Sequence, residues 1–325
     1  ASVSKTEGRG FESLCPCQPL PVSSRVPSDP CRDPMALSIH LGAHKTASTH
    51  LQFSLRQVRD RLLGAGLAYV DPAMLRGQPL SLSAVLAQGI GGRDQDSARR
   101  MLLDMRQGCR DLLISEENIL GMTHRSRLFS RRGEIYPRAA QRLRHVIALA
   151  GGGPAVVYLS LRDPASFNVS AFALQVAGGK EIDIHSYLGG RDPARSAWAG
   201  LVGRLAAVEG VSRIVLWRYE DYPALRPRLL ERLLPAGLAA EVPDPPPANV
   251  SLTQAGYDWL LRRAASGDGI DQRILARRAR ERFQPASGHA RLRLLDDETH
   301  ARSAWNYAQD IAALRAMPGV EFLEP

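Results

Sequence analysis

Short apolar runs alternate with stretches of helical spacing from residue 36 onward. Four runs predict buried strands: 36–41 (ALSIHL), 111–115 (DLLIS), 154–161 (PAVVYLSL) and 211–217 (VSRIVLW). Helical spacing is found at 51–63, at 135–150, after Pro164, at 196–208 and in most of the chain from Thr253, apart from a Gly/Pro/Ser break at 284–288. Strands separated by helices are typical of a parallel sheet. We therefore predict a three-layer α/β/α fold with a central parallel sheet and a helical C-terminal part.

The first 34 residues show neither a strand nor a helix period. They are rich in Ser, Pro, Gly and Cys and lack the apolar core of a signal peptide. We predict a disordered extension at 1–34, with Met35 as the hypothetical natural start, and one domain at 35–325. Its helical part, 242–325, begins at the Pro-rich stretch 243–247. With no apolar run of about 20 residues, no membrane span is expected, and the cytoplasm is the expected compartment.

The chain is strongly basic, and arginine supplies most of the charge. The net charge is +9, hydrophobic residues make up 44% and charged residues 23%. Such a balance suits an anionic ligand, although arginines scattered over solvated faces explain the charge equally simply, since no compact basic cluster stands out. Only three lysines occur: Lys5, Lys45 and Lys180. The cysteines lack the spacing of a zinc site, so we expect no metal.

A small polar loop between a strand and a helix predicts a phosphate-binding site resembling a P-loop. The loop is 42–49, GAHKTAST. Backbone N–H groups of such a turn, together with the helix dipole, attract an anion. Lys45 offers a compact ammonium, and Thr46, Ser48 and Thr49 offer hydroxyls. The usual GxxxxGK[ST] loop of nucleoside triphosphatases is absent, because only two residues separate Gly42 from Lys45.

The segment HKTASTxL resembles the 5′-phosphosulfate loop of bacterial-type PAPS-dependent sulfotransferases, whose common form is PKTGTTxL. Three further segments resemble motifs of the same family: Arg162-Asp163-Pro164 followed by Ser170, Ser115-Glu116-Glu117, and Tyr219-Glu220-Asp221. The resemblance implies a nucleotide-binding transferase in which Lys45, Thr46, Ala47, Ser48 and Thr49 hold the 5′ end of PAPS. Arg162 and Ser170 would hold its 3′-phosphate, with Arg291 and Arg293 as weaker candidates for a third contact.

One loop position departs from the family pattern. Ala47 stands where most members have glycine. A left-handed backbone there would cost alanine about 1–2 kcal/mol. Because the rest of the loop is intact, we expect Ala47 to be α-like, at negligible cost.

Sulfuryl transfer to a hydroxyl or amine is an in-line displacement that needs a cation on the leaving side and a base on the acceptor side. The resemblance assigns the first role to Lys45. For the base we predict Glu116, which follows the strand 111–115; its neighbour Glu117 points elsewhere and favours the helix N-terminus. Glu117, His44 and His124 stay as alternatives for the base, with His44 expected to shape the pocket. The acceptor, a glycan, lipid or small molecule, is not identified.

Two other functions remain open on sequence grounds. A P-loop kinase acting on a small molecule predicts a magnesium-binding acid at a strand end, where Glu116 and Asp163 are the nearest candidates. A non-catalytic, Arg-rich nucleic-acid-binding protein predicts a basic stripe with interleaved aromatics. Aromatic residues are only 6% of the chain, so we expect no nucleic acid as partner.

Overall fold

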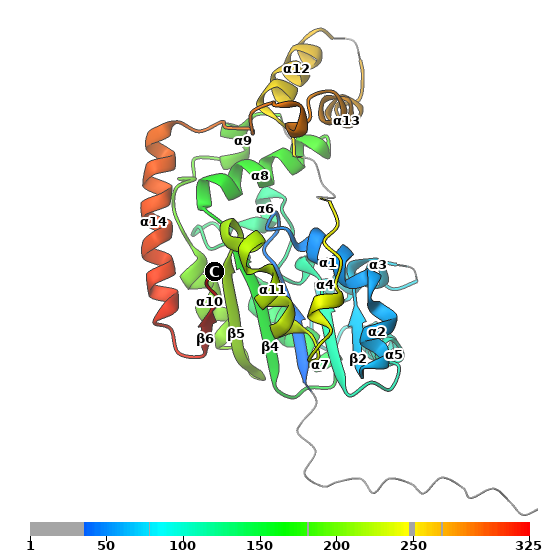
Figure 1. Ribbon diagram of the computed structural model, residues 1–325. Coiled ribbons are helices and arrows are strands. Elements are labelled where there is room, and N and C mark those ends of the chain that lie inside the picture. Colours follow the sequence, from blue (N-terminus) through cyan, green and yellow to red (C-terminus); the bar gives the residue numbers. More distant parts are fainter. Residues whose placement is uncertain (1–35, 78, 181, 247–250, 268) are drawn as a thin grey trace, which may run out of the picture. The chain divides into compact units, whose positions relative to one another are not determined.

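The computed structural model describes residues 36–325 apart from 78, 181, 247–250 and 268, so the predicted extension at 1–34 lies outside the described residues. In the described part, six strands form one sheet in the order β2-β3-β1-β4-β5-β6, and every pairing is parallel (Figure 1). The strands are β1 Leu37–His40, β2 Leu67–Val70, β3 Asp111–Ser115, β4 Ala155–Leu161, β5 Val211–Arg218 and β6 Val320–Phe322. The predicted α/β fold with a central parallel sheet is confirmed.

Successive side chains of a strand point to opposite faces of the sheet, and here the side chains on both faces are mostly apolar. Helices therefore cover both faces. On β5, Ile214 and Leu216 pack in one core, and Val215 and Trp217 pack in the other. Helices α1 (Ser48–Gln57), α2 (Arg59–Gly64) and α11 (Tyr222–Leu233) cover the second of these cores. Five helices contribute to the first: α5 (Gln95–Arg106), α7 (Ala139–Leu149), α8 (Pro164–Ala177), α10 (Trp198–Ala206) and α14 (Asp297–Arg315). These are the three layers that the sequence predicts.

The helices have the following bounds: α1 Ser48–Gln57, α2 Arg59–Gly64, α3 Pro72–Leu75, α4 Leu82–Gln88, α5 Gln95–Arg106, α6 Arg125–Leu128, α7 Ala139–Leu149, α8 Pro164–Ala177, α9 Ile184–Leu188, α10 Trp198–Ala206, α11 Tyr222–Leu233, α12 Gln254–Ala265, α13 Gln272–Arg282 and α14 Asp297–Arg315. Single 3₁₀ turns are η1 Glu117–Ile119, η2 Tyr219–Asp221, η3 Ala239–Glu241 and η4 Pro285–Ser287. In the described part of the chain, no helix is both long and apolar enough to cross a bilayer.

The strand order places a topological switch point beside β1. After β1 the chain builds β2 and β3 on one side, and it then crosses to β4, which pairs with the other side of β1. Ligands of open α/β sheets bind at such a point, at the carboxyl ends of the strands. The segments after β1, β3 and β4 all reach this edge, and α8, α9, α12 and α13 lie beyond it (Figure 1).

Candidate donor site at the carboxyl edge of the sheet

The loop after β1 has the bent backbone of an anion cradle. Gly42, Lys45 and Ala47 all have positive φ, at 43°, 66° and 65°. The start of the loop is held to β4, because the backbone N–H groups of Leu41 and Gly42 donate to the carbonyl oxygen of Tyr158, at 2.9 and 3.4 Å. Helix α1 begins directly afterwards at Ser48. A turn followed by a helix N-terminus attracts an anion.

Two small side chains shape the inside of the loop. The Ser48 hydroxyl is buried and has no hydrogen-bond partner among the described residues. A Cβ on Gly42 would lie 2.2 Å from this hydroxyl oxygen, so only glycine fits there. Thr46, also buried, donates its hydroxyl to the carbonyl oxygen of Ala43 at 2.5 Å. A buried hydroxyl without a partner is rare, and a bound anion would satisfy that of Ser48.

The expectation for Ala47 is wrong. Its φ of 65° and ψ of 15° place it in the left-handed region, and it is the N-cap of α1 without a side-chain cap. The loop must turn from the sheet edge into α1 at this residue, so the turn dictates the conformation that glycine adopts most easily. The glycine that most family members have at this position indicated such a backbone, whereas the rest of the loop, on which the expectation depended, carries no information about φ at Ala47.

Arg162 follows β4 and reaches across to the same loop. One Nη1–H group donates to the carbonyl oxygen of Lys45 at 2.8 Å, and the guanidinium lies over the ring of Tyr219, 4.6 Å from its centroid. Its Nε is buried and has no partner among the described residues. The neighbouring Asp163 does not pair with it, since the Asp163 carboxylate caps α8 and accepts the hydroxyl of Ser303. Tyr219 therefore supports Arg162, a contact that the resemblance of residues 219–221 to a family motif did not reveal.

Lys45 is one of four cations that act on one another at this edge of the sheet. Burial and the nearby charges of Arg162 and Arg280 hold the Lys45 pKa below its usual range, and burial likewise lowers the pKa of Arg162, which is also repelled by Arg291. No described carboxylate lies within 4.0 Å of a charged nitrogen of any of the four, namely Lys45, Arg162, Arg280 and Arg291. Arg280, on α13, is a member that the sequence did not reveal, because one arginine among many carries no local signal. Glu220 and Asp163 partly offset the charge of Arg162, and an anion bound between the cations would stabilise them further.

The remaining predicted donor residues lie on the adjoining helices. Thr49 is half-buried in the first turn of α1, and Ser170 is half-buried in α8, the helix that follows Arg162. No side-chain hydrogen bond connects either of them to another described residue. Arg293, by contrast, forms an ion pair with Asp297. Of the two weaker candidates, Arg291 therefore belongs to the cation cluster through its repulsion of Arg162.

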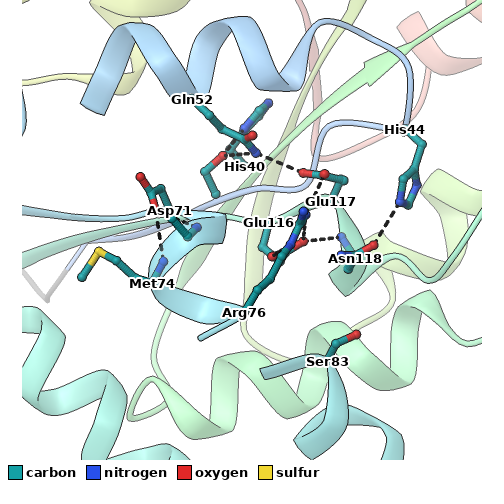
Figure 2. Close-up of polar contacts among 12 residues, drawn as sticks. His40, His44, Gln52, Asp71, Met74, Arg76, Ser83, Glu116, Glu117 and Asn118 are labelled. Atoms are coloured by element: carbon teal, nitrogen blue, oxygen red, sulfur yellow. Dashed lines mark hydrogen bonds and ion pairs between the residues drawn. The ribbon is translucent and has the colours of Figure 1, made fainter. Parts of the chain in front are cut away.

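Glu116 and Glu117 share one guanidinium, that of Arg76 (Figure 2). Arg76 donates two hydrogen bonds to Glu116, from Nε to Oε2 at 2.8 Å and from Nη2 to Oε1 at 2.6 Å. The same Nη2 also donates to Oε1 of Glu117 at 2.7 Å. Glu116 also caps η1, accepting the backbone N–H of Asn118 at 2.8 Å. Burial raises the pKa of Glu116. For Glu117, burial acts in the same direction, but Arg76, His44 and Gln52 together lower its pKa.

Glu117, rather than Glu116, faces the phosphate loop. Both charges act on Arg76, but that of Glu117 also acts on His40 and His44, whereas that of Glu116 acts on Arg142. Glu117 also accepts a hydrogen bond from Gln52 on α1 at 3.0 Å, and its side chain is the more exposed of the two, 15% against 4%. The capping role expected for Glu117 is thus taken by Glu116. Arg76, on the turn after α3, was not identified from the sequence because its partners are 40 residues away.

His44 is fixed by its neighbours on both sides of the ring. Its Nδ1 lies 2.8 Å from the hydroxyl of Tyr136, and its Nε2 lies 3.2 Å from Oδ1 of Asn118 (Figure 2). Burial lowers the His44 pKa, so the ring is neutral near pH 7. Tyr136 and Asn118 therefore fix the orientation of the His44 ring. The alternative candidate His124 lies at the start of α6.

The described residues contain no group of three or more His, Cys, Asp or Glu side chains placed to hold a metal ion. The two acids that a kinase would need at strand ends are already engaged, Glu116 by Arg76 and Asp163 by α8 and Ser303. Neither therefore presents a free carboxylate to magnesium, which binds through carboxylates and substrate phosphates.

No protein-family model matches this chain, and no curated protein matches it. Among solved structures it matches the crystal structure of a sulfotransferase from Alicyclobacillus acidocaldarius. The match has 15% sequence identity and a TM-score of 0.42, and it covers 88% of this chain and 95% of that chain. A TM-score this low gives no information about function. The function has to be inferred from the residues of the site.

Proposed function

We propose that this chain is a sulfotransferase that moves a sulfuryl group from PAPS to a hydroxyl or amine. The observation that carries the proposal is the convergence of Lys45, Arg162, Arg280 and Arg291 on a loop with an unpartnered, buried Ser48 hydroxyl. PAPS bears anionic groups on two oxygens of its ribose, O5′ and O3′, and Lys45 and Arg162 correspondingly lie in the loop after β1 and at the end of β4. A nucleoside triphosphate would also be anionic, but the carboxylates that would hold its magnesium are engaged.

The residues present fit such a donor. The loop amides, Lys45, Thr46, Ala47, Ser48 and Thr49 would hold its 5′ end, and Arg162 with Ser170 would hold the 3′-phosphate. When bound, PAPS supplies an activated sulfuryl group attached to a good leaving group. Lys45 would hold the negative charge that develops on the leaving side, where a fixed cation lowers the barrier most. Its depressed pKa also makes Lys45 a better proton donor to that oxygen than an exposed lysine.

For the acceptor proton, the sequence predicts Glu116 and the contacts favour Glu117. Both oxygens of Glu116 accept from Arg76, and one also accepts from Asn118. Glu117 receives one hydrogen bond on each oxygen and lies toward His44 and the loop. We therefore place the base at Glu117 and the cap at Glu116. Glu117→Gln should then lower kcat about 100-fold or more, whereas Glu116→Gln should change kcat little; the reverse pattern would restore Glu116 as the base.

Calorimetric titration with PAP, the desulfated product, tests the donor site without a known acceptor. We expect wild-type protein to bind PAP at micromolar Kd, and Lys45→Ala and Arg162→Ala each to weaken binding tenfold or more, about 1.4 kcal/mol. Lys180→Ala removes an exposed lysine of α8's C-terminal turn and serves as the matched control. Absence of PAP binding by folded wild-type protein overturns the proposal. Binding of MgATP in place of PAP would favour a kinase, and salt-sensitive retention on nucleic acid alone would favour a non-catalytic binder.

A further inference from the structure

The long helix α14 has an exposed face with the spacing of a helix–helix contact. The helix packs on α8, α10 and β6 at one side of the sheet (Figure 1). Along its exposed face, residues recur at intervals of 3, 4, 3, 4 and 3, which is the spacing of the seam between two packed helices. We call this set the α14 seam: Glu298, Ala301, Trp305, Ala308, Ala312 and Arg315. All six are exposed, and the buried residues of α14 lie on another side: Ser303, Tyr307, Ile311 and Leu314.

Trp305 is the large apolar side chain of this seam. It is 65% exposed, a higher fraction than that of any other large hydrophobic side chain in the described part of the chain. Its neighbours on the seam, Ala301, Ala308 and Ala312, are small, so a second helix can approach this face closely. Tryptophan is strongly enriched among the residues that dominate the energy of protein–protein contacts. An exposed indole on an otherwise smooth helix face therefore indicates a contact surface.

The seam is complementary in shape to a second copy of itself. Its intervals read the same in both directions, so a two-fold axis through its middle brings the seams of two antiparallel helices into register. Trp305 of one copy then lies against Ala308 of the other, and Ala301 lies against Ala312. The large side chain meets a small one at the centre, twice. In a parallel pair, the two Trp305 side chains would face each other instead.

The ends of the seam are complementary in charge. Glu298 is exposed in the first turn of α14, and Arg315 is in the last turn. Arg315 pairs with Glu324 of its own chain, yet half of its side chain stays exposed. The antiparallel arrangement brings Glu298 of one copy beside Arg315 of the other at both ends, whereas a parallel pair would oppose like charges. Charge complementarity therefore selects the antiparallel pair.

We propose that two copies of this chain form a homodimer by packing their α14 helices antiparallel through the α14 seam. The inference does not depend on the proposed function, because the seam contains none of the residues of the donor site. A helix of 19 residues is about 28 Å long, so this face alone is at the small end of specific interfaces, and a Kd of roughly 10 µM is expected. An anionic membrane suits the seam less well, since it carries one large apolar residue and an acid.

Sedimentation equilibrium of the full chain tests the proposal, over about 1 to 200 µM, which brackets the expected Kd. The average mass should rise from that of one chain towards that of two. Trp305→Glu should weaken the dimer tenfold or more, because it removes the central contact twice. Leu103→Glu, the same kind of change at a half-exposed residue of α5, is the matched control and should change the dimer Kd less than twofold. Both variants should fold, since both side chains are exposed.

Charge reversal tests the orientation of the two helices. Glu298→Arg alone and Arg315→Glu alone should each weaken the dimer about fivefold, because each places like charges together at both ends of the seam. The two substitutions combined should restore wild-type affinity. The intrachain pair of Arg315 with Glu324 stays lost in the combined variant, so the rescue reports on the contact between copies.

A wild-type protein with the mass of one chain over the whole concentration range would overturn the proposal. Equal weakening by Trp305→Glu and Leu103→Glu would also overturn it, because association would then not depend on α14. A dimer that Trp305→Glu weakens, but in which the combined charge reversal restores nothing, would overturn the antiparallel arrangement.

Discussion

The backbone at Ala47 adopts a conformation that an alanine holds only at a cost in free energy. A left-handed alanine costs about 1–2 kcal/mol, and glycine recovers this but loses more conformational entropy on folding, about 0.5–1 kcal/mol. We therefore expect Ala47→Gly to raise the free energy of unfolding by about 0.5 kcal/mol, the difference of these terms. Ala301→Gly, at an exposed helical position of α14, should lower it by about 1 kcal/mol. Urea denaturation measures both, and destabilisation by Ala47→Gly would show that the alanine methyl is needed.

Arg76 compensates two buried carboxylates, and its loss should show in the pH dependence of stability. Glu117 has a lowered pKa, so its pairing stabilises the fold above its ordinary value of 4.5 and is lost as the pH falls through the lowered value. Glu116 has a raised pKa, so its ionisation already costs stability as the pH rises past 4.5. Arg76→Leu should therefore lower the free energy of unfolding by roughly 2 kcal/mol at pH 8 and much less at pH 4.

The rescue of that variant distinguishes charge compensation from packing. Glu116→Gln added to Arg76→Leu should restore part of the stability at pH 8, because one buried charge is removed with its missing partner. Chemical denaturation at both pH values checks this. An equal loss at pH 4 and pH 8, with no rescue, would mean that the stem of Arg76 stabilises by contact alone.

At the residue scale, the sequence predicts individual site residues better than the contacts between them. Lys45, Ser48 and Arg162 are adjacent to predicted strand ends, so a parallel sheet brings them to one edge, and they lie there. The roles of Glu116 and Glu117 depend on Arg76, which approaches them from a turn 40 residues earlier. Arg280 comes from a helix over 200 residues after Lys45. Such long-range partnerships leave no local pattern.

Among the elements, α14 supports the end of β4 at the candidate site. The buried hydroxyl of Ser303 accepts the backbone N–H of Ala165 at 2.9 Å and donates to the Asp163 carboxylate at 2.7 Å, so it ties α14 to the start of α8. We expect Ser303→Ala to lower the free energy of unfolding by about 1–2 kcal/mol, and to weaken PAP binding because Arg162 precedes Asp163. Ser266→Ala, an exposed hydroxyl at the end of α12, should change neither. A Ser303→Ala protein with wild-type stability would show that α14 docks without this contact.

The strands that the sequence missed are the two edge strands. The four interior strands, β1, β3, β4 and β5, have neighbours on both sides, are covered by helices, and give continuous apolar runs that the sequence locates within one residue. β6 has three residues, too few for either a run or an alternation to stand out, and β2 is as short as β1 but pairs with one neighbour only, β3. The predicted helix at 51–63 likewise divides into α1 and α2 at Val58. Short edge elements depend on pairing that the sequence pattern does not display.

Across the whole molecule, the cation cluster lowers the stability of the unliganded fold and favours the binding of an anionic ligand. Lys45 has a pKa below its ordinary value of 10.5, so its charge destabilises the unliganded fold at every pH below the lowered value, and this cost is relieved as the pH rises through it. At pH 7, Lys45→Met should therefore raise Tm by about 2 °C without ligand. Wild-type protein should gain about 2.7 kcal/mol at PAP concentrations of 100 Kd, whereas the variant should gain little. Calorimetric scans with and without PAP measure both effects, with Lys180→Met, on the exposed surface, as the control. A lower Tm for unliganded Lys45→Met would assign Lys45 a structural role and remove the main support for an anion at this edge of the sheet.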